Sequence, residues 1–302
     1  MPRLSSILNR NLLSFEPSIL VEELATVLNM NLASRSYNSN SFQIGTSARD
    51  PDQAITVVDS GTKLLGVQQP NILQYNMATA YSAASVTETI ITPTQANAPF
   101  AAFKTIHMSA DGVYLFAVEY DPPTNWQLHR ATLGTPYDIT TASWDQTAAV
   151  AGTTEPFAVR LSPSGAYLYQ VVNGEIRMWD LPNYWDISTV DMNTGDRSRN
   201  YNIQDNLLSG APGDIVWSNN GLEAFVKTGT YGAVRLYNCA TAWDPTDVTY
   251  AQEVDFSTGI AAFNFATASG LWLEADTGKI WCTGQDTFSN NCFVYEYTIS
   301  VG

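Results

Sequence analysis

Stretches in which apolar and polar residues alternate recur along this chain, joined in pairs by a tight turn that carries a glycine. The five copies are TVVDSGTKLLGV, HMSADGVYLFAV, RLSPSGAYLYQV, VWSNNGLEAFVK and FATASGLWLEAD. Alternation with a period of two is typical of β-strands. Their glycines, spaced 51, 53, 56 and 49 residues apart, are Gly61, Gly112, Gly165, Gly221 and Gly270. Because a tight hairpin turn needs a residue at positive φ, which glycine adopts without a steric penalty, the sequence predicts five related hairpins.

Two further elements follow each hairpin. A third strand reads ILQYN, WQLHR, IRMWD, VRLYN or VYEYT, which predicts equivalent positions for Tyr75, His129, Trp179, Tyr237 and Tyr297. In four units a turn with an aromatic residue comes next, before a strand rich in Thr and Ser; these aromatic residues are Tyr81, Tyr137, Trp185 and Trp243. Four antiparallel strands in a unit of about fifty residues are typical of β-propeller blades.

The two ends of the chain determine the number of blades. The fifth unit stops at VYEYTISVG, after its third strand, and would leave an unpaired sheet edge. Near the other end, SRSYNSNSFQI (residues 34–44) resembles the fourth strands of the other units. We therefore expect an all-β, five-bladed propeller over residues 34–302, in which this N-terminal strand completes the last blade.

Residues 1–33 fit no repeat and predict a separate N-terminal arm. Pro17 suits the first position of a helix, and Glu22 and Glu23 would lie in an early turn. An apolar stripe with helical spacing follows, formed by Ile19, Leu20, Leu24, Val27 and Leu28. This helix either packs against the propeller or docks into another protein. We favour docking, because a closed propeller already buries its own sheets.

Composition narrows the classes of function. Of 302 residues, 45% are apolar and 12% aromatic, so the chain can bury a large core. The net charge of −15 repels nucleic acid and anionic membranes. No apolar run is long enough for a membrane span, and the first residues do not form a secretory signal. We expect a soluble protein made in a reducing cytoplasm.

Catalytic motifs are nearly absent. No nucleophile elbow, zinc-protease motif, phosphate loop or dinucleotide fingerprint is present, and we expect no enzyme activity, cofactor or metal ion. A glycosidase would need two apposed carboxylates. The acids near the hairpins have ordinary turn contexts instead; they are Asp59, Asp111, Asp214 and Glu223. Both histidines, His107 and His129, are expected to be structural.

Cysteine and tryptophan give two smaller expectations. The three cysteines, Cys239, Cys282 and Cys292, lack metal-type spacing. Cys282 and Cys292 could bridge across a hairpin, although two buried free thiols fit a reducing compartment better. Trp126 follows the insertion EYDPPTN and departs from the repeat. It is the candidate for an exposed contact residue.

The repeats resemble a known kind of protein. LHRATLGTPYDITTASWDQ, IRMWDLPNYWDISTVD and LYNCATAWDPTDVTY are similar to the tandem propeller repeats of virion proteins from tailed bacteriophages, especially marine ones. The similarity runs from about residue 55 to the end and is clearest in the middle three units. It implies a structural protein displayed on the particle, in the tail or on the capsid. The arm would bind other virion proteins, the protein would be present in many copies, and the propeller would contact glycans of the host surface.

This resemblance transfers no catalytic residue, because its motifs encode folding. Two alternatives stay open. One is a propeller glycoside hydrolase or carbohydrate-binding module, with acids gathered at one mouth of the channel. The other is a cellular interaction scaffold that works without any particle.

Overall fold

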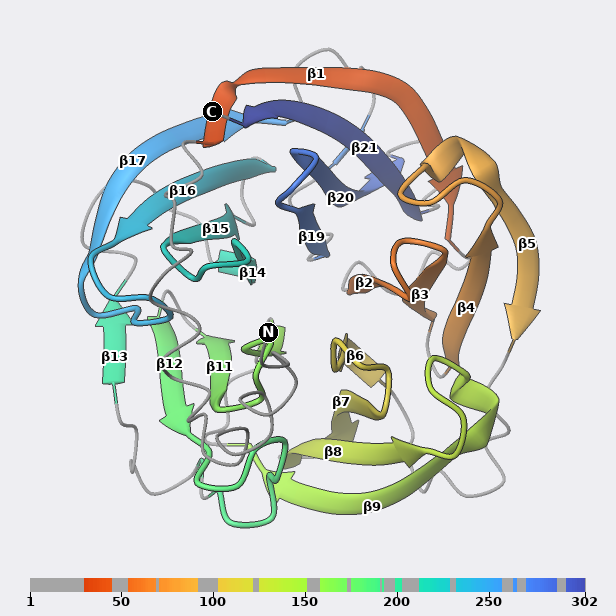
Figure 1. Cartoon of the computed structure of the whole chain (residues 1–302), viewed down its shortest axis with the longest axis vertical. Coiled ribbons are helices and arrows are strands. Elements are labelled where there is room, and N and C mark those ends of the chain that lie inside the picture. Colours follow the sequence, from red (N-terminus) through yellow and green to blue (C-terminus); the bar gives the residue numbers. More distant parts are fainter. Residues whose placement is uncertain are drawn as a thin grey trace, which may run out of the picture.

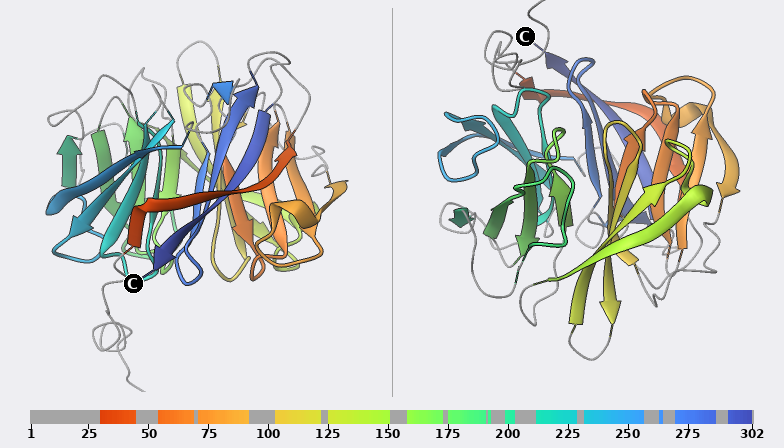
Figure 2. Two further views of the ribbon diagram at one scale, coloured as in Figure 1. Left: turned by 90° about the horizontal axis from the view of Figure 1, so that it is seen from above. Right: turned by 60° about the horizontal axis from the view of Figure 1, so that its bottom comes forward.

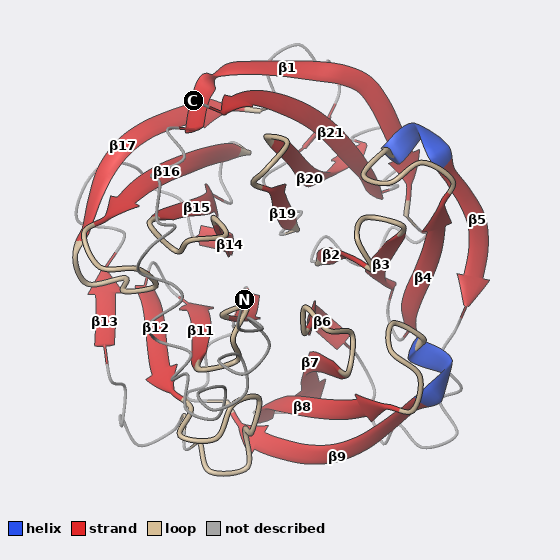
Figure 3. Cartoon of the chain, in the orientation of Figure 1, coloured by secondary structure: helices blue, strands red, loops and turns tan. Residues whose placement is uncertain are grey.

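The structure is a computed structural model in which the chain forms a closed ring of β-sheets (Figures 1 and 3). It describes residues 30–44, 54–68, 71–91, 103–121, 125–150, 158–172, 175–190, 192, 199–202, 212–228, 232–256, 263–264, 270–286 and 292–301. Within these ranges, five antiparallel sheets stand around one axis, and the helical segments are the 3-10 turns Ala83–Ser85 and Ile139–Thr141. None of the helices in this part of the chain could cross a membrane. The protein is a five-bladed β-propeller, as the repeats predict.

The blades follow one another along the chain. Blade 1 contains β2 (Ile55–Val58), β3 (Lys63–Gln68), β4 (Asn71–Met77) and β5 (Val86–Ile91). Blade 2 contains β6 (Phe103–Met108), β7 (Tyr114–Asp121), β8 (Asn125–Leu133) and β9 (Ala142–Ala149). Blade 3 contains β10 (Ala158–Leu161), β11 (Tyr167–Val172), β12 (Glu175–Asp180) and β13 (Arg199–Asn202). Blade 4 contains β14 (Pro212–Trp217), β15 (Glu223–Thr228), β16 (Ala233–Cys239) and β17 (Val248–Asp255).

Blade 5 is assembled from both ends of the chain. Its inner edge consists of β18 (Phe263–Asn264) and β19 (Leu271–Glu274), which both pair with β20 (Lys279–Asp286). β21 (Cys292–Val301) follows, and β1 (Met30–Gln43) lies outside it as the fourth strand (Figure 2). The predicted closure by an N-terminal strand is therefore present.

The closing strand begins four residues before the predicted boundary at residue 34. Met30 pairs with Val301, and the side chains of Met30 and Leu32 are buried among residues of blades 4 and 5. Burial of the apolar side chains of Met30 and Leu32 in this core stabilises the fold, which explains why the strand extends to include them. The part of the arm that remains, residues 1–29, lies outside the described residues.

Burial explains why strands at different depths have different sequences. All four residues of β2 are buried, as are those of β10, because an inner strand lies between two neighbouring blades. β9 lies at the perimeter, and its first six residues alternate between half-buried and exposed. The core is therefore divided among the junctions between blades. At one junction Phe116 and Leu128 of blade 2 pack with Val159 and Leu168 of blade 3.

Candidate functional site

The repeated turns hold each blade together at one end. Gly61, Gly112, Gly165 and Gly221 have φ between 71° and 81°, in the hairpin turns where the sequence expected them. The turn aromatics, which are Tyr81, Tyr137, Trp185 and Trp243, also have positive φ. Each donates its backbone N–H to the carbonyl of its own glycine at 2.8–3.0 Å and covers that glycine with its ring. A Cβ at any of these glycines would lie 2.5 Å or less from the ring, so the glycine is required by both φ and space.

The same turn aromatics join neighbouring blades. The carbonyl of Tyr137 accepts from Lys63 Nζ of blade 1 at 3.2 Å, and that of Trp185 from Arg130 of blade 2 at 2.9 Å. The carbonyl of Trp243 accepts from the Tyr169 hydroxyl of blade 3 at 2.8 Å. For Tyr81 the donor is Lys279 of blade 5. Each turn aromatic is thus held by the blade that precedes it in the ring, and these residues are structural.

Two sequence assignments need correction in register. Gly270 precedes β19 and bonds to Thr283, whereas the hairpin between β19 and β20 has positive φ at Gly278. The stretch LWLE is therefore the inner strand of blade 5, and its second strand is KIWCTGQD. In blade 2 the residue equivalent to Tyr75 is Ala131 and not His129, because β8 starts two residues earlier relative to its turn. Side-chain alternation is unchanged by a shift of two, so the pattern could not reveal it.

Trp126 is not an exposed contact residue. It lies in β8 opposite Tyr120, is 5% exposed, and packs at the junction of blades 2 and 3. β7 ends at Asp121 and β8 begins at Asn125, so Trp126 lies inside the paired part of β8. The cysteines Cys239, Cys282 and Cys292 are free and buried. Burial raises the pKa of the Cys282 and Cys292 thiols to about 12, which keeps them protonated and unreactive.

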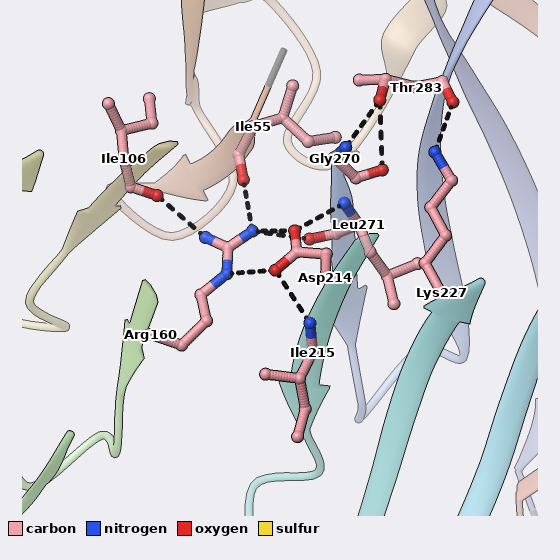
Figure 4. A network of polar contacts seen from close by, with 9 residues as sticks. All are labelled: Ile55, Ile106, Arg160, Asp214, Ile215, Lys227, Gly270, Leu271 and Thr283. Carbon is pink, nitrogen blue, oxygen red and sulfur yellow. Dashed lines mark hydrogen bonds and ion pairs between the residues drawn. The ribbon is translucent and has the colours of Figure 1, made fainter. Parts of the chain in front are cut away.

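An ion pair lies on the axis of the ring, where all five blades meet (Figure 4). Arg160 of β10 donates from Nε to Asp214 of β14 at 2.9 Å, and a second bond joins its Nη2 to the other carboxylate oxygen. The guanidinium also donates to three backbone carbonyls, those of Ile55, Ile106 and Leu271. These lie on β2, β6 and β19, so a single side chain contacts the inner strands of blades 1, 2 and 5 as well as Asp214 of blade 4.

The Asp214 carboxylate also accepts several hydrogen bonds. Besides Arg160 it accepts from the backbone N–H of Ile215 at 2.8 Å and of Leu271 at 2.9 Å. Both side chains of the pair are 5% exposed or less. Nearby, Lys227 of blade 4 donates to the carbonyl of Thr283 in blade 5 at 2.9 Å. A buried charged group is costly unless it is paired and hydrogen-bonded. The bonds of Arg160, Asp214 and Lys227 satisfy this requirement and link neighbouring blades.

The other acids named from the sequence serve separate local roles. Asp59 forms an ion pair with Lys63 at 3.2 Å in the first hairpin turn. Asp111 accepts from the Ser109 hydroxyl and from a backbone N–H of its own turn. Glu223 is buried on β15 and accepts from the N–H of Met30 at 3.2 Å. The structure therefore gives each of them its own partners and assembles no acidic pair from the four.

A cavity of about 190 Å³ lies at the mouth of the channel that carries the turn aromatics. Two successive positions on each inner strand line it. The first set, which we call the variable level, comprises Thr56, His107, Arg160, Val216 and Trp272. The next residue along each strand gives the apolar level, which comprises Val57, Met108, Leu161, Trp217 and Leu273. Trp243, Ile215 and the turn residues Ala110 and Pro163 complete the lining.

The polar groups of this cavity carry little net charge. Arg160 lines the cavity, and its positive charge is balanced by the carboxylate of Asp214. Burial, and secondarily the Arg160 cation, lower the pKa of His107 to about 3, so its imidazole is neutral near pH 7. No Asp or Glu occurs among the lining residues that the structure describes, and no group of three metal-ligating side chains occurs in the same part of the chain.

Arg160 is the functional residue that sequence reasoning missed. Its signal was a single cation inside the apolar strand of FAVRLSPSG, and Asp214 gave the matching signal as an anion in GDIVWSNNG. A charge in a strand buried on both sides needs a partner from another strand. Recognising the pair required knowing that β10 and β14 meet on the axis.

Comparisons with known proteins agree with this architecture. The sequence matches no protein-family model and no curated protein. Among solved structures, the chain is similar to the PQQ-bound aldose sugar dehydrogenase of Streptomyces coelicolor, with a TM-score of 0.51, 10% identity, and coverage of 88% of this chain and 98% of that one. It is also similar to the periplasmic gluconolactonase of Pseudomonas aeruginosa, with a TM-score of 0.46, 12% identity, and coverage of 78% and 65%.

A β-propeller domain from Myceliophteria thermophila gives a TM-score of 0.44 at 8% identity, with coverage of 88% of this chain and all of that one. Identities this low show the fold alone. The protein accordingly belongs to the class of β-propeller proteins, which includes enzymes and scaffolds.

Proposed function

We propose that this protein is a structural component of a tailed-bacteriophage particle, in which the propeller is displayed and the N-terminal arm attaches it. The resemblance of the repeats to those of phage virion proteins supports this role. The use of the buried charged groups supports it further, because Arg160, Asp214 and Lys227 are committed to contacts between blades. A ring held in this way suits a rigid, non-enzymatic display platform.

The position of the closing strand is the observation that carries the attachment. β1 is the outermost strand of blade 5 (Figure 1), and its first residue, Met30, pairs with Val301, the last residue of β21. An arm that precedes β1 would therefore leave the ring from its outermost strand, next to the last residue of β21. A segment tethered there can bind another virion protein without passing through the channel, where Arg160 lies.

Deletion of residues 1–29 tests the attachment while preserving β1. A tagged full-length chain and the deleted chain would be supplied during infection by the encoding phage, and purified particles analysed by quantitative mass spectrometry. We expect the full chain to be incorporated and the deleted chain, still folded by circular dichroism, to be absent. Leu24→Asp in the apolar stripe should reduce incorporation, whereas Thr26→Asp outside the stripe should not. Equal incorporation of the deleted chain would refute the attachment role.

Carbohydrate binding is a second candidate, and the cavity at the channel mouth favours it. Its lining includes three tryptophans, Trp217, Trp243 and Trp272, together with the imidazole of His107. Aromatic faces provide apolar contact, and polar edges provide directed hydrogen bonds, the combination found in small-molecule sites. This candidate is compatible with display on a particle, where contact with host glycans would be the result.

A further inference from the structure

The five repeats of one chain provide an internal comparison of equivalent positions. The apolar level has a hydrophobic residue in all five blades, and four blades share the glycine and the turn aromatic. At the variable level the five residues are a hydroxyl, an imidazole, a guanidinium, an aliphatic side chain and an indole. Each blade must fold in the same way, which explains why the glycine, the turn aromatic and the apolar level recur. Folding does not explain why the variable level has a different type of side chain in each blade.

Part of this variation has a structural explanation. Arg160 is needed once, because one guanidinium already reaches the carbonyls of Ile55, Ile106 and Leu271. The difference among the other blades remains. His107 is half-buried, lines the cavity, and forms no side-chain hydrogen bond with any residue that the structure describes. A neutral imidazole offers one donor and one acceptor, and here both are available to a ligand.

The size of the cavity limits what it can hold. A cavity of roughly 150 Å³ accommodates benzene, whereas drug-sized ligands occupy about 300–1,000 Å³. At about 190 Å³, this cavity suits one six-membered ring. It opens at the mouth of the channel, since the exposed turn residues Ala110 and Pro163 form part of its rim. A ring attached to a longer chain could therefore enter while the rest of the chain stays outside.

The lining also limits the chemistry of the ligand. Trp272 stacks on Tyr81 with ring centroids 5.7 Å apart and planes at 15°, which fixes the orientation of its indole. Trp243 is fixed by its contact with Gly221. Flat, immobile rings suit a ligand with apolar C–H faces, and His107 and Thr56 suit one with hydroxyl groups at its edge. Because Asp214 balances Arg160, a charged group on the ligand would meet no free countercharge.

We propose that the cavity at the channel mouth binds one neutral pyranose ring, at the end or on a branch of a surface glycan. This inference deepens the proposed role of a displayed propeller by naming the ligand class and the site. Trp243 and Trp272 contact the ring through their indoles, and the imidazole of His107 exchanges hydrogen bonds with its hydroxyls.

Binding can be measured on the full-length protein with simple sugars. The probes are the methyl glycosides of glucose, galactose, mannose and N-acetylglucosamine, with glucuronic acid and sialic acid as charged comparisons. Saturation-transfer NMR and titration calorimetry should detect at least one neutral glycoside, and the charged sugars should bind more weakly. Failure of all four neutral glycosides, or a preference for a charged sugar, would overturn the proposal.

Three variants test the location. Ala110→Trp places an indole at the rim from an exposed turn position and should weaken binding about tenfold or more, which corresponds to about 1.4 kcal/mol. Ala84→Trp makes the same change at an exposed position that does not line the cavity, and should leave binding within about twofold. His107→Ala should weaken binding while the protein remains folded by circular dichroism, and it decides the question if Ala110→Trp does not fold. Full binding by both Ala110→Trp and His107→Ala would place the sugar elsewhere.

The sugar-binding measurements do not depend on the result of the particle-incorporation assay. Sugar binding by a protein that never enters particles would retain the site and reject the virion role. Incorporation into particles without sugar binding would do the opposite.

Discussion

Arg160 of blade 3 and Asp214 of blade 4 meet on the propeller axis, in contact with the inner strands of all five blades. The inner strands are short, with four residues in β2, β10 and β19, and among the described residues no backbone hydrogen bond joins two adjacent sheets. Directed bonds between blades must therefore come from side chains. At the centre, these bonds are made by the Arg160–Asp214 ion pair. Nearer the channel mouth, side chains of one blade donate to the carbonyls of the turn aromatics in the next.

Breaking the axial pair should cost far more than breaking a similar pair near the surface. Asp214→Asn removes the countercharge of a buried guanidinium, and we expect a loss of about 3–5 kcal/mol in the free energy of unfolding, measured by urea denaturation. The matched control is Asp145→Asn. Asp145 makes the same two-point contact with Arg130, at 2.8 and 3.1 Å, but its side chain is 34% exposed. There we expect a loss of about 1 kcal/mol or less. Equal losses would show that the axial pair has no special role.

The turn glycines should tolerate no side chain. Gly165→Ala puts a methyl group at φ 73° and 2.2 Å from the ring of Trp185, so either the turn or the indole must move. We expect a loss of about 2–4 kcal/mol, combining the cost of the left-handed backbone with overpacking. Gly134→Ala is the control, since its nearest neighbour would be an ordinary contact at 3.6 Å and its φ is not positive. Thermal unfolding followed by circular dichroism compares the two, and a Gly165→Ala protein as stable as Gly134→Ala would contradict the requirement.

Closure of the ring should depend on β1 and not on the segment before it. Deletion of residues 1–43 removes the strand that covers β21 and exposes its edge, so we expect aggregation and a large fall in melting temperature. Deletion of residues 1–29 should leave a folded propeller.

A point substitution makes the same test without shortening the chain. Leu32→Asp buries a charge in the core between blades 4 and 5 and should lower the melting temperature strongly, whereas Ser34→Asp, at an exposed position of the same strand, should change it little. Size-exclusion chromatography and calorimetry distinguish the outcomes. Similar melting temperatures for the two variants would mean that β1 contributes little to the ring.

The free energy of unfolding should decrease as the pH is lowered, because His107 titrates. Its pKa is about 3 in the folded protein against 6.5 for an unperturbed histidine, so the unfolded chain binds one more proton between these values. The contribution of a neutral His107 is therefore intact above pH 6.5 and is lost as the pH falls toward 3, by about 1.4 kcal/mol for each pH unit.

His107→Gln removes this titration but keeps a polar side chain at the channel. Urea denaturation between pH 4 and 7 should show a shallower fall in stability for His107→Gln than for the unmodified protein. Parallel curves would indicate that His107 is accessible to protons in the folded state.

The repeat and its local chemistry can be predicted from the order of residues along the chain. Glycine at positive φ and the aromatic residue of the following turn are requirements within one blade, so they appear as a period in the sequence at Gly112 and Tyr137 and again at Gly165 and Trp185. The count of five also followed from the sequence, because a blade without a fourth strand needs one from the other end of the chain. The same reasoning failed at Gly270, because the hairpin that follows β19 turns at Gly278 and Gly270 precedes that strand.

The contacts between blades could not be predicted in this way. Arg160 and Asp214 are 54 residues apart, and their meeting depends on the angle at which five sheets converge, which no local pattern records. The burial of Trp126 and the assembly of the cavity from His107, Trp243 and Trp272 depend on that same convergence. The hydrophobic effect is non-directional. The periodic pattern of apolar residues therefore predicts which side chains become buried. Which of these side chains contact one another depends on the geometry of the closed ring.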